Sequence, residues 1–277
     1  MDSLAPLLNH IPPTVEYYFS GAACAGGVYN YDGTAPCGHL HLVKSGAMHV
    51  TVPGKQDIII TRPTVLLFPR PCAHTMLPGE GDVELVCGTV ELGFAEQSPL
   101  VLSLPACLVI EVAEIPAIGA TLELLYREAF GVGIGRQTAI NRLLEYFMIH
   151  VLRHLVAKDL LSQGMLAAMS DPRLALALNA MHEHPAYLWT LEQLASIANM
   201  SRARFAANFQ KATGIPPLEY LTNWRLSVAR GLLRQGRPLK SVASAVGYQS
   251  PEAFGRVFAK RIGKTPAQWL RIHRTNA

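Results

Sequence analysis

The hydrophobic residues in the first part of the chain occur in short runs that alternate with polar residues. Between residues 14 and 112 these runs are separated by glycine and proline, and Ser45-Gly46 and Pro53-Gly54 stand where hairpin turns are expected. Many short strands with such punctuation are typical of a small β-sandwich or barrel. The pattern predicts strands at residues 39–43, 48–52, 58–60, 65–68, 83–92, 101–104 and 108–112.

The period of the hydrophobic pattern changes after residue 118. Apolar residues then recur every three or four positions, as in amphipathic helices, first in residues 120–130 and 138–161. Residues 162–170 have the composition of a linker, and Asp171-Pro172 is a typical helix start. The chain is therefore expected to be a two-domain α+β protein, with an N-terminal β-barrel or sandwich, two following helices and an all-α C-terminal domain. The later helices are predicted at residues 171–183, 191–198, 201–212, 216–233, 239–246, 250–261 and 265–273.

The all-α segment contains the same short pattern twice. In the first copy a capping box is expected at residues 190–193, Ser201 precedes a helix, and Gly214 closes that helix. The second copy has Ser250 and Gly263 in the corresponding places. Each copy consists of two short helices joined by a tight turn, which is the geometry that places the second helix in the major groove of DNA.

Each copy also contains two phenylalanines spaced four residues apart, Phe205 and Phe209 in the first and Phe254 and Phe258 in the second. Side chains at this spacing share one helix face, so the four rings are expected in the core. Polar side chains on the other faces are the candidates for DNA contact, and those near the helix start reach base edges best. They are Arg202, Arg204, Asn208 and Lys211 in the first copy and Gln249, Ser250, Glu252, Arg256 and Lys260 in the second.

Charge separates the two halves of the chain. The net charge is +4, but residues 171–277 contain 15 Lys+Arg against 5 Asp+Glu, whereas residues 1–170 contain 9 against 15. A basic segment joined to an acidic one is typical of a nucleic-acid-binding domain beside a domain with another role. Charge alone leaves open a basic face that is merely solvated.

The sequence gives no indication of membrane insertion or secretion. No apolar run approaches the roughly 20 residues that a membrane helix needs. Met1–Pro13 lacks the basic start of a secretory signal and contains an early Asp2. We therefore expect a cytoplasmic protein without a membrane partner.

Two longer runs with fixed spacings lie in the basic segment. One is Gly214-x2-Pro217-x2-Tyr220-Leu221-x3-Arg225-Leu226-x2-Ala229-x2-Leu232-Leu233, and the other is Val242-Ala243-x2-Val246-Gly247-Tyr248-x-Ser250-x3-Phe254-x3-Phe258-x4-Gly263-x-Thr265-Pro266. Over about a hundred residues this segment resembles the DNA-binding domain of AraC/XylS-type regulators. The resemblance implies two recognition helices in successive major-groove segments, with Arg204 and Arg256 as the foremost direct contacts. Small side chains depart from this pattern in the first recognition helix, at Ala203, Ala206 and Ala207.

The β-rich half contains three further runs. They are His39-Leu40-His41-Leu42-Val43-x2-Gly46, Pro63-x3-Leu67-Phe68-Pro69-Arg70-Pro71-x2-His74 and Leu85-Val86-Cys87-Gly88-Thr89-Val90. This half resembles the cupin-type sensor domain of many such regulators, in particular the subgroup with a hypochlorite-responsive member that has redox-active cysteines. Catalytic cupins have a glutamate a few residues after the His-x-His pair, and residues 43–49 contain no acid. A cupin-type enzyme fused to a DNA-binding domain is therefore the weaker alternative.

The resemblance leaves three kinds of effector open. The first is an oxidant that forms a disulfide between Cys24 and Cys87, and the second is an organic ligand inside the barrel. The third is zinc or another transition metal ion. The ligands expected for such a metal are Cys24, His41, His74 and Cys87, with His39 and Cys37 as substitutes. All five cysteines lie in the first 107 residues, and their odd number argues against a disulfide framework, so each is also a candidate for a buried small apolar residue.

We therefore expect a sequence-specific transcription regulator, most simply an activator, rather than an enzyme. Its expected domains are a cupin-like sensor at 1–115, a helical dimerisation or linker region at 116–165, and the tandem helix-turn-helix domain at 171–277. Packing against the barrel is the alternative role of the helices at 120–130 and 138–161. The expected partners are double-stranded promoter DNA, RNA polymerase, the effector and a second copy of the chain.

Overall fold

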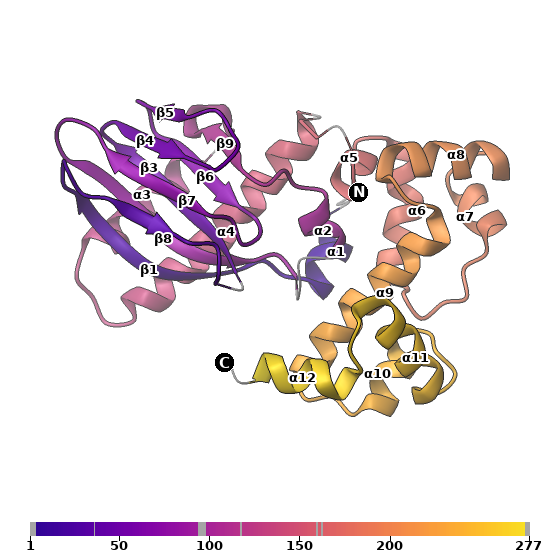
Figure 1. Cartoon of the computed structure of the whole chain (residues 1–277). Helices are drawn as coiled ribbons and strands as arrows, with labels where there is room; N and C mark the ends of the chain where they lie inside the picture. Colours follow the sequence, from indigo (N-terminus) through magenta and orange to yellow (C-terminus); the bar gives the residue numbers. More distant parts are fainter. Residues whose placement is uncertain are drawn as a thin grey trace. The chain divides into compact units, whose positions relative to one another are not determined.

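The computed structural model describes residues 4–35, 37–93, 98–116, 118–158, 160–161 and 163–274. They form two compact units, each described by itself (Figure 1). The β unit comprises Pro13–Leu92 and Leu104–Lys158, and the helical unit comprises Met1–Pro12, Gly93–Ser103 and Asp159–Ala277. Unlike the consecutive domains expected from the sequence, the two units therefore interleave along the chain.

The described part of the β unit contains a five-stranded sheet of order β1-β8-β3-β6-β9 and a four-stranded sheet of order β2-β7-β4-β5. Neighbouring strands are antiparallel. The strands are β1 (Thr14–Ala23), β2 (Tyr29–Tyr31), β3 (Gly38–Ser45), β4 (Met48–Thr51), β5 (Ile58–Ile60), β6 (Thr64–Phe68), β7 (His74–Pro78), β8 (Val83–Glu91) and β9 (Leu108–Glu111). The α+β fold predicted from the sequence is confirmed.

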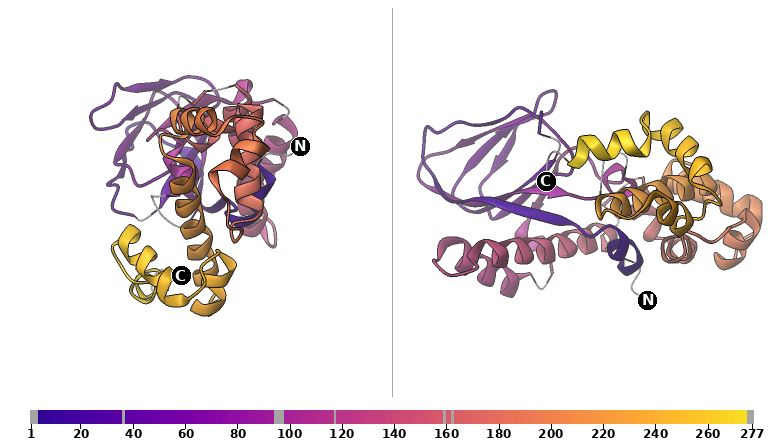
Figure 2. Two further views of the ribbon diagram at one scale, coloured as in Figure 1. Left: turned by 90° about the vertical axis from the view of Figure 1, so that its right-hand side faces the viewer. Right: turned by 90° about the horizontal axis from the view of Figure 1, so that it is seen from below.

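The core of the β unit lies between the two sheets. The five-stranded sheet contributes Val43, Leu66 and Leu85, and the four-stranded sheet contributes Met48 and Met76. Helices α3 (Gly119–Phe130) and α4 (Arg136–Ala157) pack against β1, as the views of Figure 2 show. The first six residues of strand β3 form a continuous buried run rather than an alternating one, so this strand is buried on both faces.

The helical unit consists of α-helices, including two from the first 103 residues. Helix α9 connects the helices that precede it to α10–α12 (Figure 1). The two early helices are α1, which packs on α6, and α2, which packs on α5 and α9. The bounds are α1 (Ala5–His10), α2 (Pro99–Leu102), α5 (Met165–Met169), α6 (Pro172–Glu183), α7 (Leu191–Ile197), α8 (Arg202–Thr213), α9 (Pro217–Arg234), α10 (Leu239–Ala245), α11 (Pro251–Ile262) and α12 (Pro266–Arg274).

Two predicted segments differ from the structure. The strand expected at residues 101–104 is wrong, because its first two residues belong to α2, which begins with Pro99 at its first turn and packs on α5 and α9. The linker expected at 162–170 contains α5, whose first backbone N–H, at Met165, donates to the Ser103 hydroxyl at 2.7 Å. Both short helices are stabilised by tertiary contacts that a local pattern does not contain.

Candidate functional site

The first helix-turn-helix consists of α7 and α8. Thr190 and Gln193 form the predicted capping box at the start of α7. The Ser201 hydroxyl accepts a hydrogen bond from the Arg204 backbone N–H at 3.4 Å, and Gly214 ends α8 in the left-handed conformation. Asn199 in the turn has φ +50°, which asparagine tolerates better than most residues. The predicted caps of this motif are confirmed.

The second helix-turn-helix consists of α10 and α11 and repeats this arrangement. Ser250 accepts from the Ala253 backbone N–H at 3.2 Å, and Gly263 ends α11 in the left-handed conformation. The turn residue with positive φ is Gly247, at +82°. In both motifs the phenylalanine pair is fully buried with ring centroids 5.5 Å apart, so the predicted core positions are also confirmed.

The candidate DNA contacts of α8 lie outside this core, but two of them have partners within the motif. The Arg202 guanidinium pairs with Glu192 on α7 at 2.9 Å, and both side chains are exposed. The Asn208 amide donates to the Met200 sulfur at 3.8 Å. Arg204 and Lys211 are exposed. Of the two arginines in the first turn of α8, Arg202 is therefore paired with Glu192, and Arg204 is outside this ion pair.

The candidates of the second motif are arranged differently. Gln249, Glu252, Arg256 and Lys260 are exposed, and the hydroxyl of Ser250 is used as the cap of α11. The ion pair of this helix lies at its end, where Arg261 contacts Glu219 at 2.7 Å. The exposed face of α11 therefore presents Arg256 and Lys260 one turn apart.

The β unit brings together three of the predicted sensor residues in its interior. His41 on β3 lies opposite Cys87 on β8, and its Nδ1 is 3.1 Å from the Cys87 sulfur. Its Nε2 is 3.0 Å from Nε2 of His74 on β7. Nδ1 of His74 is 2.8 Å from the Cys72 carbonyl oxygen. These contacts form one continuous chain from a thiol to a backbone carbonyl.

The direction of every hydrogen bond in this chain follows from its last acceptor. A carbonyl only accepts, so Nδ1–H of His74 donates to it, and Nε2 of neutral His74 accepts from His41. Nδ1 of neutral His41 then accepts from the Cys87 thiol. Burial lowers the pKa of His74 to about 4 and that of His41 well below its usual value, and it raises the pKa of Cys87 to about 12. All three groups are therefore uncharged at neutral pH.

Aromatic rings enclose this chain. The His74 ring is stacked between Tyr31, at 4.4 Å, and Phe68, at 3.9 Å. Tyr18 donates to the Tyr31 hydroxyl at 3.0 Å, and it occupies the irregular position of β1, where the pairing with β8 shifts between Tyr17 and Phe19. Bulges of this kind redirect a side chain next to functional sites, and no sequence motif indicated this one.

The other predicted sensor residues lie apart from this chain of hydrogen bonds or have weaker connections to it. Cys24 is exposed, and Ala23 before it pairs with Val83. Val83 is four residues from Cys87 on β8, a separation of roughly 13 Å at strand rise, whereas a disulfide needs Cα atoms within about 7 Å. The structure therefore does not bring Cys24 and Cys87 together.

His39 and Cys37 complete the predicted metal set. His39 is buried 4.9 Å from the Tyr31 ring, and its Nδ1 has no hydrogen-bond partner, while Cys37 is half-buried before β3. Across the residues that the structure describes, no group of three or more His, Cys, Asp or Glu side chains is arranged to hold a metal ion. One physical reason is that both ring nitrogens of His41 already face Cys87 and His74.

Comparison with known proteins fits both parts of this geometry. A cupin family model matches residues 2–157, more than half of the chain, and a helix-turn-helix domain model matches residues 194–272. An HTH-type transcriptional regulator of Haemophilus influenzae is 33% identical over 80% of this chain and 73% of its own length. The chain belongs to the AraC family of helix-turn-helix transcriptional regulators and contains a cupin domain.

Two other proteins are also similar to this regulator. The RCS-specific transcriptional activator RclR of Escherichia coli is 29% identical over 83% of this chain and 82% of its own length. The crystal structure of ToxT from Vibrio cholerae covers 94% of this chain and 97% of its own, at 12% identity and a TM-score of 0.41.

In the part of the regulator that the structure describes, no helix is both long and apolar enough to cross a membrane.

One functional side chain that the family signature contained, but whose role was not predicted, is Arg225 on α9. Its guanidinium donates to the carbonyls of Pro185 at 2.7 Å and Tyr187 at 2.8 Å, before the first helix-turn-helix, and lies over the Tyr248 ring in the turn of the second. A Cβ on Gly247 would lie 2.7 Å from the Ala186 carbonyl oxygen and 3.0 Å from this guanidinium. Arg225 therefore positions the two motifs of the regulator relative to each other.

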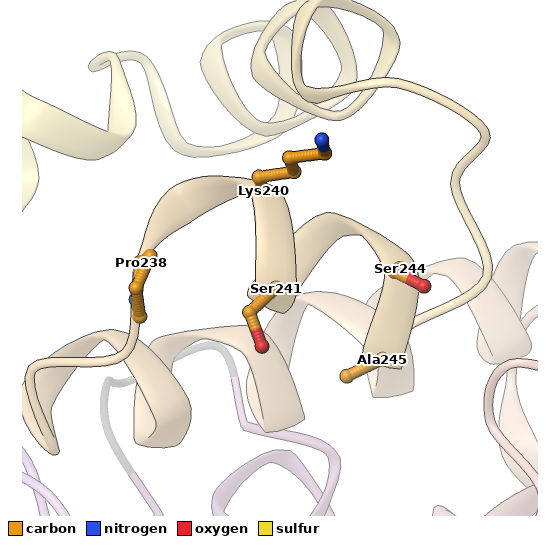
Figure 3. Close-up of a pocket in the computed structure, with 5 residues that line it drawn as sticks. All are labelled: Pro238, Lys240, Ser241, Ser244 and Ala245. Carbon is orange, nitrogen blue, oxygen red and sulfur yellow. The ribbon is translucent and has the colours of Figure 1, made fainter.

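A shallow hollow lies on α10, the first helix of the second motif. Pro238, Lys240, Ser241, Ser244 and Ala245 line it, and Figure 3 shows the Lys240 side chain extending away from the helix. Lys240, Ser241 and Ser244 are exposed. Exposed cationic and hydroxyl groups on the first helix of such a motif suit phosphate contacts better than a small-molecule site.

Proposed function

We propose that this regulator activates transcription from specific promoter DNA and that a small oxidant acting on Cys87 switches it. Recognition helices α8 and α11 read the DNA, and Arg204 and Arg256 make the direct contacts. These contacts are flanked by Lys211, Gln249, Glu252 and Lys260. Lys240 contacts the phosphate backbone. The names of the relatives support a regulator without enzymatic activity, and the name of the E. coli relative supports an activator.

The observation that supports the effector is the buried chain from Cys87 to His74. The Cys87 side chain is 2% exposed and its thiol is protonated, so it reacts poorly as a thiolate. A small uncharged oxidant such as hypochlorous acid reaches a buried thiol more readily than a charged one. In the reaction the sulfur loses two electrons and becomes a sulfenic acid, and hypochlorous acid is reduced to chloride with release of a proton.

The added oxygen enlarges a side chain that is buried and hydrogen-bonded to His41. The Cys87 sulfur lies 3.1 Å from His41, and Cys87 pairs with both β1 and β3. A larger polar group here breaks the hydrogen bond to His41 and disturbs the pairing of β1 with β8. A Cys24–Cys87 disulfide then becomes attainable only if β1 leaves its register, which makes it a second step rather than the first.

DNA recognition is tested by fluorescence anisotropy of the full chain on promoter DNA at physiological salt. Arg204→Ala and Arg256→Ala are each expected to lose about 1–3 kcal/mol on the cognate site, which is about fivefold to 150-fold in affinity. Arg62→Ala, which removes the same charge from the β unit, is the matched control. An equal loss on all sequences with a shallower salt slope would reassign the arginine to a phosphate. Absence of any sequence preference in the unmodified chain would reject the proposal.

The effector is tested by treating the full chain with hypochlorite and then measuring its free thiols, its bound metal and its DNA affinity. We expect one thiol to be lost first, at Cys87, together with a change in DNA affinity. Cys87→Ser should lose this response, and Cys24→Ser should keep it. Simultaneous loss of two thiols would favour the disulfide as the first product, and release of one metal ion per chain would favour a metal centre. An unchanged DNA affinity after loss of the Cys87 thiol would reject the switch.

A further inference from the structure

Strand β1 stands at the edge of the five-stranded sheet in the described part of the β unit, and its irregular position lies beside Cys87. Phe19 pairs with Cys87, whereas Tyr17 pairs with the residue that follows Cys87 on β8. Tyr18 is therefore an extra residue of β1, as in a β-bulge. The two strands approach closely here, because a Cβ on Gly88 would lie 3.1 Å from a backbone oxygen of β1. A larger group at Cys87 is therefore expected to displace the bulge, since an edge strand is held by one neighbouring strand rather than two.

The two adjacent tyrosines of this bulge have different partners. Tyr18 interacts with the sulfur: burial raises the pKa of Cys87 to about 12, and a hydrogen bond from Tyr18 to the thiolate form lowers it in part. Tyr17 interacts with helix α4: the Arg136 guanidinium lies 5.3 Å from the centre of its ring and donates to its hydroxyl at 3.2 Å. The bulge therefore contacts the thiol through one residue and the helix through the residue before it.

Helix α4 holds the bulge with two side chains, which are both half-buried. The backbone N–H of Tyr17 donates to Oδ1 of Asn141 at 2.9 Å. Arg136 also donates to the Ser20 hydroxyl at 2.9 Å and to the Glu128 carbonyl at 2.8 Å, so it joins β1 to the last turn of α3. The Asn141 contact is made to the backbone of the bulge itself, so any displacement of the strand acts on it directly.

Helix α4 is also the last element of the β unit before the chain enters the helical unit. It runs from Arg136 to Ala157, which is about 33 Å at the rise of an α-helix, and the β unit ends at Lys158. A packed helix carries a displacement along its length as a rigid element. A shift at the start of α4 therefore reaches the point at which the chain leaves the β unit.

We propose that Asn141 is a positioning residue that couples Cys87 to α4: a larger group at Cys87 displaces the β1 bulge, and the hydrogen bond from Tyr17 to Asn141 transfers this displacement to the helix. Arg136 keeps α3 attached to the same part of β1, so the two helices move together. The coupling itself depends on these contacts alone, and only its effect on DNA affinity rests on the proposed function.

The test is hydrogen–deuterium exchange of the full chain, read by mass spectrometry, in variants that enlarge residue 87 without an oxidant. Cys87→Asn places a larger polar side chain beside His41, and we expect amide exchange of residues 136–145 to become about threefold faster or more. Asn141→Leu removes the acceptor with little change in size, and in that background Cys87→Asn should leave the exchange of this segment unchanged. Asn141→Asp keeps an acceptor oxygen and should keep the response.

The matched control is Lys44→Met, which removes a different contact between the sheet and α3. The Lys44 ammonium lies 4.7 Å from the centre of the Phe130 ring, and its loss should leave the response of α4 to Cys87→Asn intact. A response that disappears in Lys44→Met as well would show general loosening of the helices and would overturn the specific role of Asn141.

Exchange of residues 39–43 in the same samples separates coupling from loss of structure, because β3 should stay protected in every variant. If β3 loses protection in Cys87→Asn, hypochlorite treatment of the unmodified chain and of Asn141→Leu gives the same comparison. Faster exchange of residues 136–145 in both backgrounds, or in neither, would contradict the proposal. Hypochlorite that oxidises Cys87 and speeds exchange in α4 without changing DNA affinity would leave the coupling intact and reject only the switch.

Discussion

The two helix-turn-helix motifs share the same buried, capping and turn residues, which we call the frame. They differ in the side chains that they expose. Each has a serine cap, a buried phenylalanine pair at 5.5 Å, a turn residue with positive φ and a left-handed glycine at the helix end. In α8, however, the outward side chains Arg202 and Asn208 contact Glu192 and Met200. In α11 the ion pair lies at the helix end, and Arg256 faces outward in mid-helix.

This comparison separates two kinds of constraint. Residues of the frame fix where the recognition helix lies, so the same residue types are needed twice. Residues of the outward face determine what is bound, and they are free to differ. Changes in the frame should therefore affect both motifs alike in stability, whereas changes on the outward face should affect them unequally in DNA binding.

The largest expected effect is on the shared phenylalanines. Phe205→Ala and Phe254→Ala each leave a cavity in a fully buried site and should each lose about 3–5 kcal/mol of unfolding free energy. All three tryptophans, Trp189, Trp224 and Trp269, lie in the helical unit, so their fluorescence during urea unfolding reports on it. Losses that differ by more than about 2 kcal/mol between the variants would show that the frames are not equivalent.

The turns should distinguish the motifs. Gly247→Ala combines φ +82° with a Cβ placed 2.7 Å from a backbone carbonyl, and should lose about 2–3 kcal/mol. Asn199→Ala has only the positive φ to accommodate and should lose about 1 kcal/mol. Urea unfolding compares the two, with Asn199→Gly as the control that should cost little. Equal losses would mean that the close approach of Gly247 to Ala186 is relieved without cost.

The serine caps should again be equivalent. Ser201→Ala and Ser250→Ala each remove one acceptor of a helix-start N–H, and should each lose about 1 kcal/mol of unfolding free energy. Glycine at either position should lower the unfolding free energy by only a few tenths of a kcal/mol. If serine is needed for DNA contact rather than capping, DNA affinity will fall in the glycine variants while stability remains.

The smallest effect is expected from the surface ion pairs. Glu192→Gln releases Arg202 from an exposed pair and should change stability by less than about 1 kcal/mol. DNA affinity should rise about twofold to fivefold at low salt, because a negative charge near the phosphates is removed. Glu219→Gln, which releases Arg261, is the matched change in the second motif. The same gain at high salt as at low salt would exclude this electrostatic explanation.

The sensor residues of the β unit show which contacts could be predicted from the sequence. The motif histidines His41 and His74 and the thiol of Cys87 do meet, as the resemblance implied. Cys24, placed with them by the same resemblance, follows the end of β1, where Ala23 pairs with Val83. Strand pairing places residues side by side according to register, and neither register nor the irregular position of Tyr18 is encoded in a local pattern.

The helical unit shows the same limit for packing. The segment at 101–104 has an apolar pattern suited to a strand, but its first two residues end α2, which packs on α5 and α9. Arg230, which is buried, is one of several basic residues on α9 in the sequence, and nothing near it in the chain distinguishes a buried arginine from an exposed one. Its burial arises only when elements distant in sequence pack around it.

The sequence by itself determined the features that depend on short spacings: the α+β order, the helix caps, the paired phenylalanines and the two motifs that define the family. Each of these is settled by residues within one or two turns of each other, where propensity and periodicity act. The tertiary structure decided the rest: the hydrogen-bond chain of Cys87, His41 and His74, the connection through Arg225, and the buried charge of Arg230. These depend on long-range contacts, because hydrogen bonding and desolvation act between side chains that only the folded chain brings together.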